Sequence, residues 1–174
     1  MTVDELVELL DALGTEPSEP GVPTDGLSAL DHALQCASEL AGRRPHDTEL
    51  QLAGLVHDIG HQFGPDDHHG RIGAEMVRPL LGARVAGLVE AHVPAKRYLV
   101  ATEAHYRACL SADSVRTLAL QGGALAPAEA AAFVSSPWAG DALVLRRADD
   151  AAKVPGRSVA PLAHWVPVLR AAAR

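Results

Sequence analysis

Cysteine is scarce in this sequence: only Cys36 and Cys109 occur, and they lie far apart along the chain. They do not have the short spacing of a thiolate metal site. The start of the chain, Met1 to Glu5, is acidic, whereas a secretion signal begins with basic residues and continues with apolar ones. We therefore expect a reducing, cytoplasmic setting.

Basic side chains are also in deficit. The chain has 15 Lys and Arg against 22 Asp and Glu, and its formal net charge is −7 at pH 7. Since a nucleic acid or an anionic membrane surface is bound through a basic face, we expect no nucleic-acid partner and no membrane association. No apolar run reaches the length of a membrane span. An anionic ligand would have to be met by a few local cations.

Alternation of apolar and polar residues, the pattern typical of strands, is missing as well. Apolar residues recur instead at helical spacing. The expected helices cover about residues 2–14, 28–42, 47–61, 69–82, 85–92, 111–121, 127–134 and 138–153, and a closing helix follows residue 158. A chain of 174 residues with 48% hydrophobic residues is long enough for one domain and too short for two of ordinary size. The sequence predicts one all-α domain over residues 1–174, and it does not indicate the oligomeric state.

Several residues mark the ends of these expected helices. Thr2 with Glu5 has the pattern of a capping box, and Asp47 and Ser111 are suitable N-caps. Gly82 is expected to stop the helix that begins at residue 69.

The segment at residues 50–61 carries the main chemical signal. Its apolar residues at helical spacing are expected to face a core; they are Leu52, Leu55, Val56 and Ile59. His57 and His61 are expected to project from one side of the same turn, with Asp58 between them. Imidazole and carboxylate suit iron, manganese, cobalt or zinc, and a carboxylate can bridge two cations. The alternative is a plain helix end with Gly60 as its left-handed cap, and the further histidines of the chain argue against it.

A family resemblance is carried by an ordered set of residues: His32, His57, Asp58, His69, His92 and Asp149. This order resembles the HD-domain superfamily of metal-dependent phosphohydrolases. Residues 32–37, 92–99, 110–114, 120–123 and 145–150 are similar to one branch, the HD-domain mixed-valent di-iron oxygenases, which break the C–P bond of 1-hydroxyphosphonates. The resemblance, from about residue 25 to residue 156, implies a single HD-domain helical bundle around a dinuclear metal site. Its core would span about residues 28–156, with residues 15–26 as a candidate lid loop.

The resemblance also implies the metal ligands. One iron would be held by His32, His57, Asp58 and Asp149. Asp58 would bridge to a second iron, held by His69 and His92. His68 is the alternative to His69, and His69 is preferred because the family has a histidine four residues before a Gly-Ala pair. Asp150 is the alternative to Asp149, which stands in the family's Arg-x-x-Asp pattern.

Substrate contacts follow from the same resemblance. A phosphonate dianion needs cations and hydroxyl or amide donors, and the matching residues are Lys96, Ser114, Gln121 and Arg146. Taken singly, each has an ordinary structural explanation, such as a solvated lysine or a first-turn serine. His61 matches a non-ligand histidine that would hydrogen-bond the substrate or bound oxygen; an ordinary helix-end histidine is the alternative.

The implied reaction uses an Fe(II)/Fe(III) pair and O2 as co-substrate. It converts a small organophosphonate, a 1-hydroxyalkylphosphonate, into a carboxylic acid and inorganic phosphate. Relatives that act on aminophosphonates carry a Tyr and a Glu before the first histidine, where this chain has Val22 and Asp25. Asp25 remains a candidate contact for a cationic substituent. The replacement predicts an altered preference among 1-hydroxyphosphonates.

Three other functions compete with this one. An HD-type phosphohydrolase would use the same ligands to activate water against a phosphate ester, without O2. A cyclitol oxygenase, whose substrate carries no phosphonate, would have less need of the anion-binding set Lys96, Ser114, Gln121 and Arg146. A non-catalytic binding domain is disfavoured because no expected ligand is missing.

Overall fold

The computed structural model describes residues 1–18 and 26–174, and over these residues the fold is all-α, as predicted. The helices are α1 (Val3–Ala12), η1 (Leu13–Thr15), α2 (Ala29–Arg43), α3 (Thr48–Val56), η2 (Ile59–Gln62), α4 (His69–Thr102), η3 (Tyr106–Cys109), α5 (Ala112–Leu120), α6 (Pro127–Val134), α7 (Ala139–Ala151) and α8 (Leu162–Ala172). The extended pairing found among the described residues is an isolated bridge between Pro17 and Ser28. No helix in this part of the chain is long and apolar enough to cross a membrane.

The predicted helix starts are present. The Thr2 hydroxyl accepts from Glu5 N while the Glu5 carboxylate accepts from Thr2 N, which is the predicted capping box. Asp47 accepts from Leu50 N at the start of α3, and Ser111 accepts from Ser114 N at the start of α5. Helix α5 ends at Leu120, and Gly122 and Gly123 in the turn that follows have φ angles of 92° and 72°, which favour glycine.

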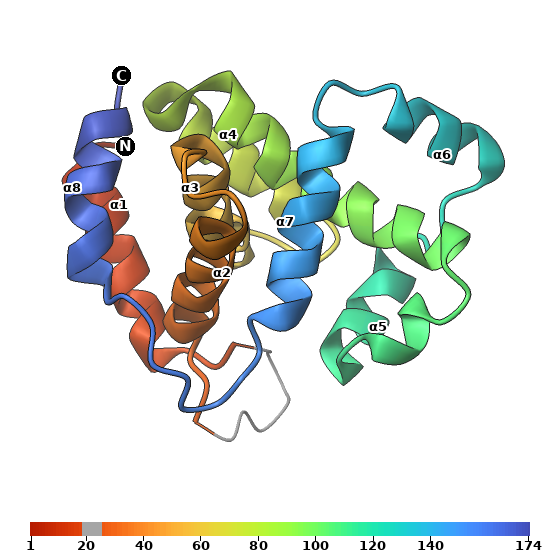
Figure 1. Ribbon diagram of the computed structural model, residues 1–174, viewed down its shortest axis with the longest axis horizontal. Coiled ribbons are helices and arrows are strands. Elements are labelled where there is room, and N and C mark those ends of the chain that lie inside the picture. The colour runs from red at the N-terminus through yellow and green to blue at the C-terminus, as the bar shows by residue number, and fades with distance from the viewer. Residues whose placement is uncertain (19–25) are drawn as a thin grey trace.

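Helix α3 lies inside the bundle, and every residue from Leu50 to Val56 is buried. It packs against α2 and α4, and α7 closes the group by contacting both of these helices. Figure 1 shows α1 and α8 side by side at one end of the molecule and α5 and α6 at the other. The four predicted core residues around the end of α3 are at most 1% exposed: Leu52, Leu55, Val56 and Ile59.

The helical run expected over residues 50–61 is broken, which corrects the prediction. Helix α3 ends at Val56, the chain turns at His57 and Asp58, and η2 follows. Gly60 is not a left-handed cap, because its φ is not among the positive ones. It permits close approach instead: a Cβ there would lie 2.0 Å from the backbone oxygen of His69. His57 and His61 are thereby directed to different sides of Asp58.

Helix α4 is a hairpin of two helical arms, residues 69–81 and 83–102. Gly82 interrupts it with φ 86° and ψ 178°, as predicted for a stop. The arms are in close contact, because a Cβ on Gly73 would lie 3.2 Å from Val89 Cγ1. The prediction of a short helix ending at His92 is wrong. The second arm continues through Pro94, since burial of Ala95, Lys96 and Leu99 offsets the hydrogen bond that proline removes.

Candidate metal centre and anion cavity

The first group of donor atoms comes from α2, the turn after α3, and α7. His32 Nε2 lies 3.2 Å from Asp149 Oδ1 and 3.5 Å from Asp58 Oδ2. His57 Nε2 lies 3.2 Å from the same Asp58 oxygen and 3.8 Å from Asp149 Oδ1. The two imidazole Nε2 atoms are 3.2 Å apart. Two imidazoles and two carboxylates therefore converge on one point.

The second group gathers at the other oxygen of Asp58. His69 Nε2 and His92 Nε2 each lie 3.5 Å from Asp58 Oδ1, and they are 2.9 Å apart. The two histidines come from opposite arms of the α4 hairpin, so the turn at Gly82 brings them together. His61 Nε2, from η2, lies 3.8 Å from the same oxygen. One carboxylate thus faces two clusters of imidazoles, one with each oxygen.

The remote nitrogen of each buried histidine is fixed by a backbone carbonyl. His32 Nδ1 lies 3.0 Å from Ala152 O, His57 Nδ1 2.8 Å from Gly54 O, His69 Nδ1 2.6 Å from Asp66 O, and His92 Nδ1 2.5 Å from Val89 O. A carbonyl only accepts, so each Nδ1 is assigned the proton and each Nε2 presents a lone pair to the centre. Lone pairs this close repel unless a cation lies between them. The donor set therefore fits two metal ions.

Electrostatics favour cations at both positions. Burial opposes ionisation of Asp149, but Arg146 and the neighbouring histidines hold the pKa of this carboxyl well below its usual range. Burial, followed by the neighbouring His92, lowers the pKa of His69 to about 3, so His69 is neutral at pH 7. Burial alone would lower the pKa of His57, but Asp58 and Asp149 outweigh it and raise that pKa to about 10. Without a metal ion, a proton on His57 Nε2 therefore balances the two carboxylates, and a bound cation would replace that proton and leave the Nε2 lone pair as its ligand.

The structure separates the alternative ligands. The His68 side chain is 55% exposed and forms an ion pair with Asp67, whereas His69 reaches the cluster. The Asp150 carboxylate accepts from the Tyr106 hydroxyl and pairs with Arg146, whereas Asp149 faces His32 and His57.

A polar cavity of about 30 Å³ opens beside the two clusters, and we call it the anion cavity. Its lining residues are Ser18, Asp58, His61, His69, His92, Lys96, Asp113, Ser114, Thr117, Arg146, Asp149 and Lys153. Lys96 is buried and donates to the Thr117 hydroxyl at 2.9 Å. Burial and, after it, the charge of Arg146 lower the Lys96 pKa to about 8. The cavity thus combines cations with hydroxyl groups, the donors that an anion requires.

Two residues expected in this cavity have other contacts. The Arg146 guanidinium lines the cavity but also pairs with Asp149 Oδ2 at 2.8 Å and donates to the Tyr106 hydroxyl at 3.0 Å. Gln121 is not among the lining residues; its amide donates to Asp66 O at 3.2 Å. Asp25, the other substrate candidate, and Val22 lie outside the described residues.

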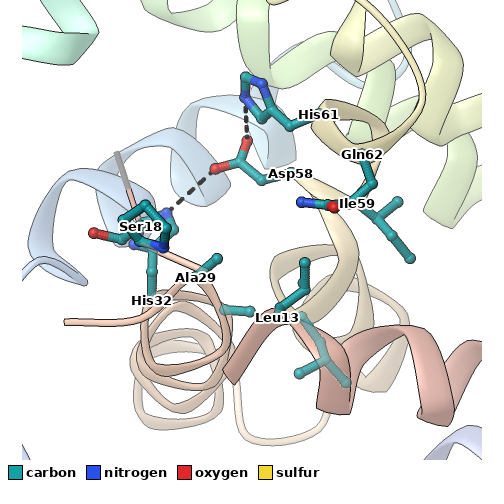
Figure 2. A pocket seen from close by; sticks show the side chains of 11 residues that line it. Leu13, Ser18, Ala29, His32, Asp58, Ile59, His61 and Gln62 are labelled. Atoms are coloured by element: carbon teal, nitrogen blue, oxygen red, sulfur yellow. Dashed lines mark ion pairs between the residues drawn. The ribbon is translucent and has the colours of Figure 1, made fainter. Parts of the chain in front are cut away.

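A second cavity of about 50 Å³ adjoins the first, since both are lined by Ser18, Asp58 and His61. We call it the apolar cavity, because it also receives aliphatic side chains from η1, α2, α3 and η2. These are Leu13, Ala29, Ala33, Leu55 and Ile59. Figure 2 shows the Asp58 carboxylate between His32 and His61, with one oxygen toward each ring.

Sequence reasoning missed four residues around these cavities. Thr117 and Lys153 line the anion cavity, and Lys153 donates to the Ser114 hydroxyl at 3.2 Å. Tyr106 contacts Arg146, and Asp66 contacts both His61 and His69. Spacing offers a signal for two of them: Thr117 is three residues after Ser114, and Lys153 is four after Asp149, so each shares a helix face or end with a candidate.

Comparison with known proteins gives independent information. Residues 27–117 match the model of the HD domain family. The chain is 40% identical over 154 residues to hydroxymethylphosphonate dioxygenase of Gimesia maris, covering 81% of this chain and 75% of the relative. It is 32% identical over 150 residues to [1-hydroxy-2-(trimethylamino)ethyl]phosphonate dioxygenase (glycine-betaine-forming) of Leisingera caerulea, covering 80% of this chain and 76% of the relative.

The match to the HD domain spans the segment that supplies His32, His57, Asp58, His69 and His92, and the relatives extend the similarity over most of the chain. The chain belongs to the HD-domain phosphonate oxygenase family.

Proposed function

We propose that this protein is an O2-dependent di-iron oxygenase that cleaves the C–P bond of a 1-hydroxyalkylphosphonate. One substrate and one O2 give one carboxylic acid and one phosphate: the C–H and C–P bonds of C1 break, and new C–O and P–O bonds form. Both oxygen atoms enter the products, so no further reductant is consumed. The cytoplasmic location expected from the sequence stays a prediction.

The observation that supports the proposal most is the position of the anion cavity against a donor set for two metals. Lys96, Ser114 and Arg146 line the same cavity as Asp58, His69 and His92. An anion bound by the first three would lie next to any metal held by the others. The two relatives, each named for a phosphonate, add support.

Each side chain has a proposed task. We assign the first metal to His32, His57, Asp58 and Asp149 and the second to Asp58, His69 and His92. Two iron ions, when bound, would supply the redox chemistry with O2. Lys96 and the Ser114 hydroxyl would bind phosphonate oxygens. Arg146 would do so with a guanidinium N–H that its contacts with Asp149, Asp150 and Tyr106 do not use. Gln121 would act indirectly, by fixing the Asp66 carbonyl that orients His69.

The apolar cavity favours a substrate with a small uncharged substituent on C1. With the phosphonate in the anion cavity, the substituent would point past Asp58 and His61 toward Leu55 and Ile59. A volume of about 50 Å³ is room for only a few heavy atoms. The candidate contact for a cationic substituent, Asp25, lies outside the described residues.

The first test is phosphate release by the iron-loaded protein with and without O2. We expect O2-dependent release from hydroxymethylphosphonate and 1-hydroxyethylphosphonate, at a higher kcat/KM than from 2-amino-1-hydroxyethylphosphonate, because aliphatic side chains line the adjoining cavity. Phosphate and carboxylic acid are measured together, and they should form in equal amounts.

Phosphomonoesters are the control substrates for that experiment. Release from an ester under argon would identify a phosphohydrolase and refute the oxygenase proposal. A preference for the amino substrate would leave the oxygenase intact and refute only the assignment of the apolar cavity.

A second prediction concerns the charge of Lys96. Its pKa of about 8 means that the ammonium form is lost as the pH rises through 8. Since kcat/KM reports the free enzyme, its value for hydroxymethylphosphonate should decline above about pH 8. Below pH 8, kcat/KM of Lys96→Met should be roughly 10- to 100-fold lower than that of wild type, because one charge-assisted hydrogen bond to the substrate is lost.

Lys96→Arg is the matched control, because guanidinium keeps its charge throughout this pH range. It should retain more kcat/KM than Lys96→Met and lose the decline that sets in near pH 8. An identical decline in wild type and Lys96→Met would show that another group titrates.

A further inference from the structure

We propose that Tyr106 is a positioning residue for substrate binding, because it holds the Arg146 guanidinium in one orientation at the anion cavity. The inference rests on the proposed function, in which Arg146 binds a phosphonate oxygen. Tyr106 belongs to η3, between α4 and α5, and it is not among the residues that line the anion cavity or the apolar cavity. It would therefore act on the substrate through Arg146.

The first observation is that the Tyr106 hydroxyl completes a ring of hydrogen bonds on one edge of the guanidinium. The phenol oxygen accepts from Arg146 Nε at 3.0 Å, and its O–H donates to Asp150 Oδ2. The other oxygen of Asp150 accepts from Arg146 Nη2. Two of the five guanidinium hydrogens are thereby bound, and because the group is planar, these two bonds fix its orientation.

The second observation is what this arrangement leaves for the other donors of Arg146. Its Nη1 pairs with Asp149 Oδ2 at 2.8 Å, and its Nη2 lies 3.5 Å from the hydroxyl of Ser114, which lines the anion cavity. Nη2 carries two hydrogens, and Asp150 needs only one of them, so the second can point into the cavity. The guanidinium cannot turn this hydrogen away without breaking its contacts with Tyr106 and Asp150.

The third observation is that Tyr106 is itself firmly held. The residue is 5% exposed, and the Arg147 guanidinium lies over its ring, with Cζ 5.1 Å from the ring centroid. Arg147 in turn pairs with Glu103. Burial, which the charge of Arg146 opposes only in part, raises the pKa of the Tyr106 phenol above its ordinary value. The hydroxyl therefore keeps its proton at neutral pH and remains a donor to Asp150.

Tyr106→Phe keeps the ring and its contact with Arg147 and removes only the hydroxyl. Arg146 Nε then loses its acceptor, and we expect the guanidinium to turn until Nε and Nη2 both bind Asp150, the favoured bidentate geometry. This turn would move the second Nη2 hydrogen away from Ser114. A tyrosine that only filled space would be replaced by phenylalanine without effect on the cavity.

Binding of inorganic phosphate to the cobalt(II)-loaded protein under argon tests the inference without turnover. Tyr106→Phe should raise the Kd of phosphate roughly 10-fold, because a hydrogen bond from a charged donor is lost. In the iron-loaded variant, KM for hydroxymethylphosphonate should rise by a similar factor, while kcat changes by less than about threefold. The cobalt content should match wild type, because Asp149 keeps its contact with Nη1.

A double-mutant cycle with Arg146→Lys shows whether Tyr106 acts through Arg146. Lysine has a single ammonium group and no Nε–H that the phenol could orient. In the Arg146→Lys protein, we therefore expect Tyr106→Phe to leave the Kd of phosphate unchanged within about twofold. An equal increase in Kd with arginine and with lysine at position 146 would refute the inference.

Tyr98→Phe is the matched control. Tyr98 is the other tyrosine of the chain and packs against Phe133, outside the anion cavity and the apolar cavity, so this variant should behave as wild type.

Asp150→Asn probes the same hydrogen-bonded ring from its other side. Asparagine offers one acceptor where Tyr106 and Arg146 need two, so the Kd of phosphate should again rise. This variant decides the question if Tyr106→Phe does not fold. An unchanged Kd, or a loss of cobalt in a folded Tyr106→Phe, would overturn the inference. A wild type that releases no phosphate with O2 would refute the proposed function instead, and the comparison of phosphate binding would still stand.

Discussion

Asp58→Asn is expected to lose the second metal and to reduce O2-dependent phosphate release by roughly 10³-fold or more, equivalent to about 4 kcal/mol of transition-state stabilisation. Each oxygen of Asp58 faces a different cluster of imidazoles. Asparagine keeps one ligating oxygen and replaces the other with an amide NH2, which is not a metal ligand. The first metal retains His32, His57 and Asp149, so the second is the one expected to leave.

Asp67→Asn is the control for that substitution. Asp67 is exposed, close in sequence, and its ion pair is a 3.8 Å contact with His68. Metal content by elemental analysis and phosphate release should match wild type in this variant. If Asp58→Asn retained two metals and most of its activity, Asp58 would not be the bridge.

Local sequence patterns predicted the helices well where the signal is itself local. The caps at Thr2, Asp47 and Ser111 depend on hydrogen bonds within one turn, and all three are present. The stop at Gly82 depends on the φ of one residue. The end predicted at His92 fails because tertiary burial of the residues after Pro94 overrides a local helix breaker.

The candidate site likewise contains residues that the sequence order reveals and residues whose roles depend on distant partners. The histidines and Asp149 were recognisable from their order along the chain, and the structure brings them together. The roles of Gln121 and Arg146 depend on partners distant in sequence, Asp66 for one and Tyr106 for the other. No pattern around either residue reveals these partners. The hairpin of α4 is the exception, since two histidines on either side of a glycine stop could have suggested that their rings meet.

Gly60→Ala is expected to destabilise the fold by about 3 kcal/mol or more and to impair binding of the second metal. The added Cβ would lie 2.0 Å from His69 O and 2.7 Å from Gly73 N. Both atoms belong to the backbone at the start of α4, so η2 and α4 must separate. Overpacking of this kind costs about 1–3 kcal/mol where side chains can adjust, and more where they cannot. Urea unfolding and cobalt(II) titration measure the two effects.

Gly140→Ala separates this close approach from a general effect of adding a methyl group. Nothing lies within 4 Å of a Cβ at Gly140, on α7. That variant should bind two metals and be unchanged or more stable by up to about 1 kcal/mol, because alanine is the better helix former. His69 belongs to the backbone that the added methyl group would displace, and His57 does not. Gly60→Ala should therefore lose the second metal before the first. If the affinity for both metals fell equally, Gly60 would be needed for the fold as a whole and not specifically to keep His69 close to Asp58.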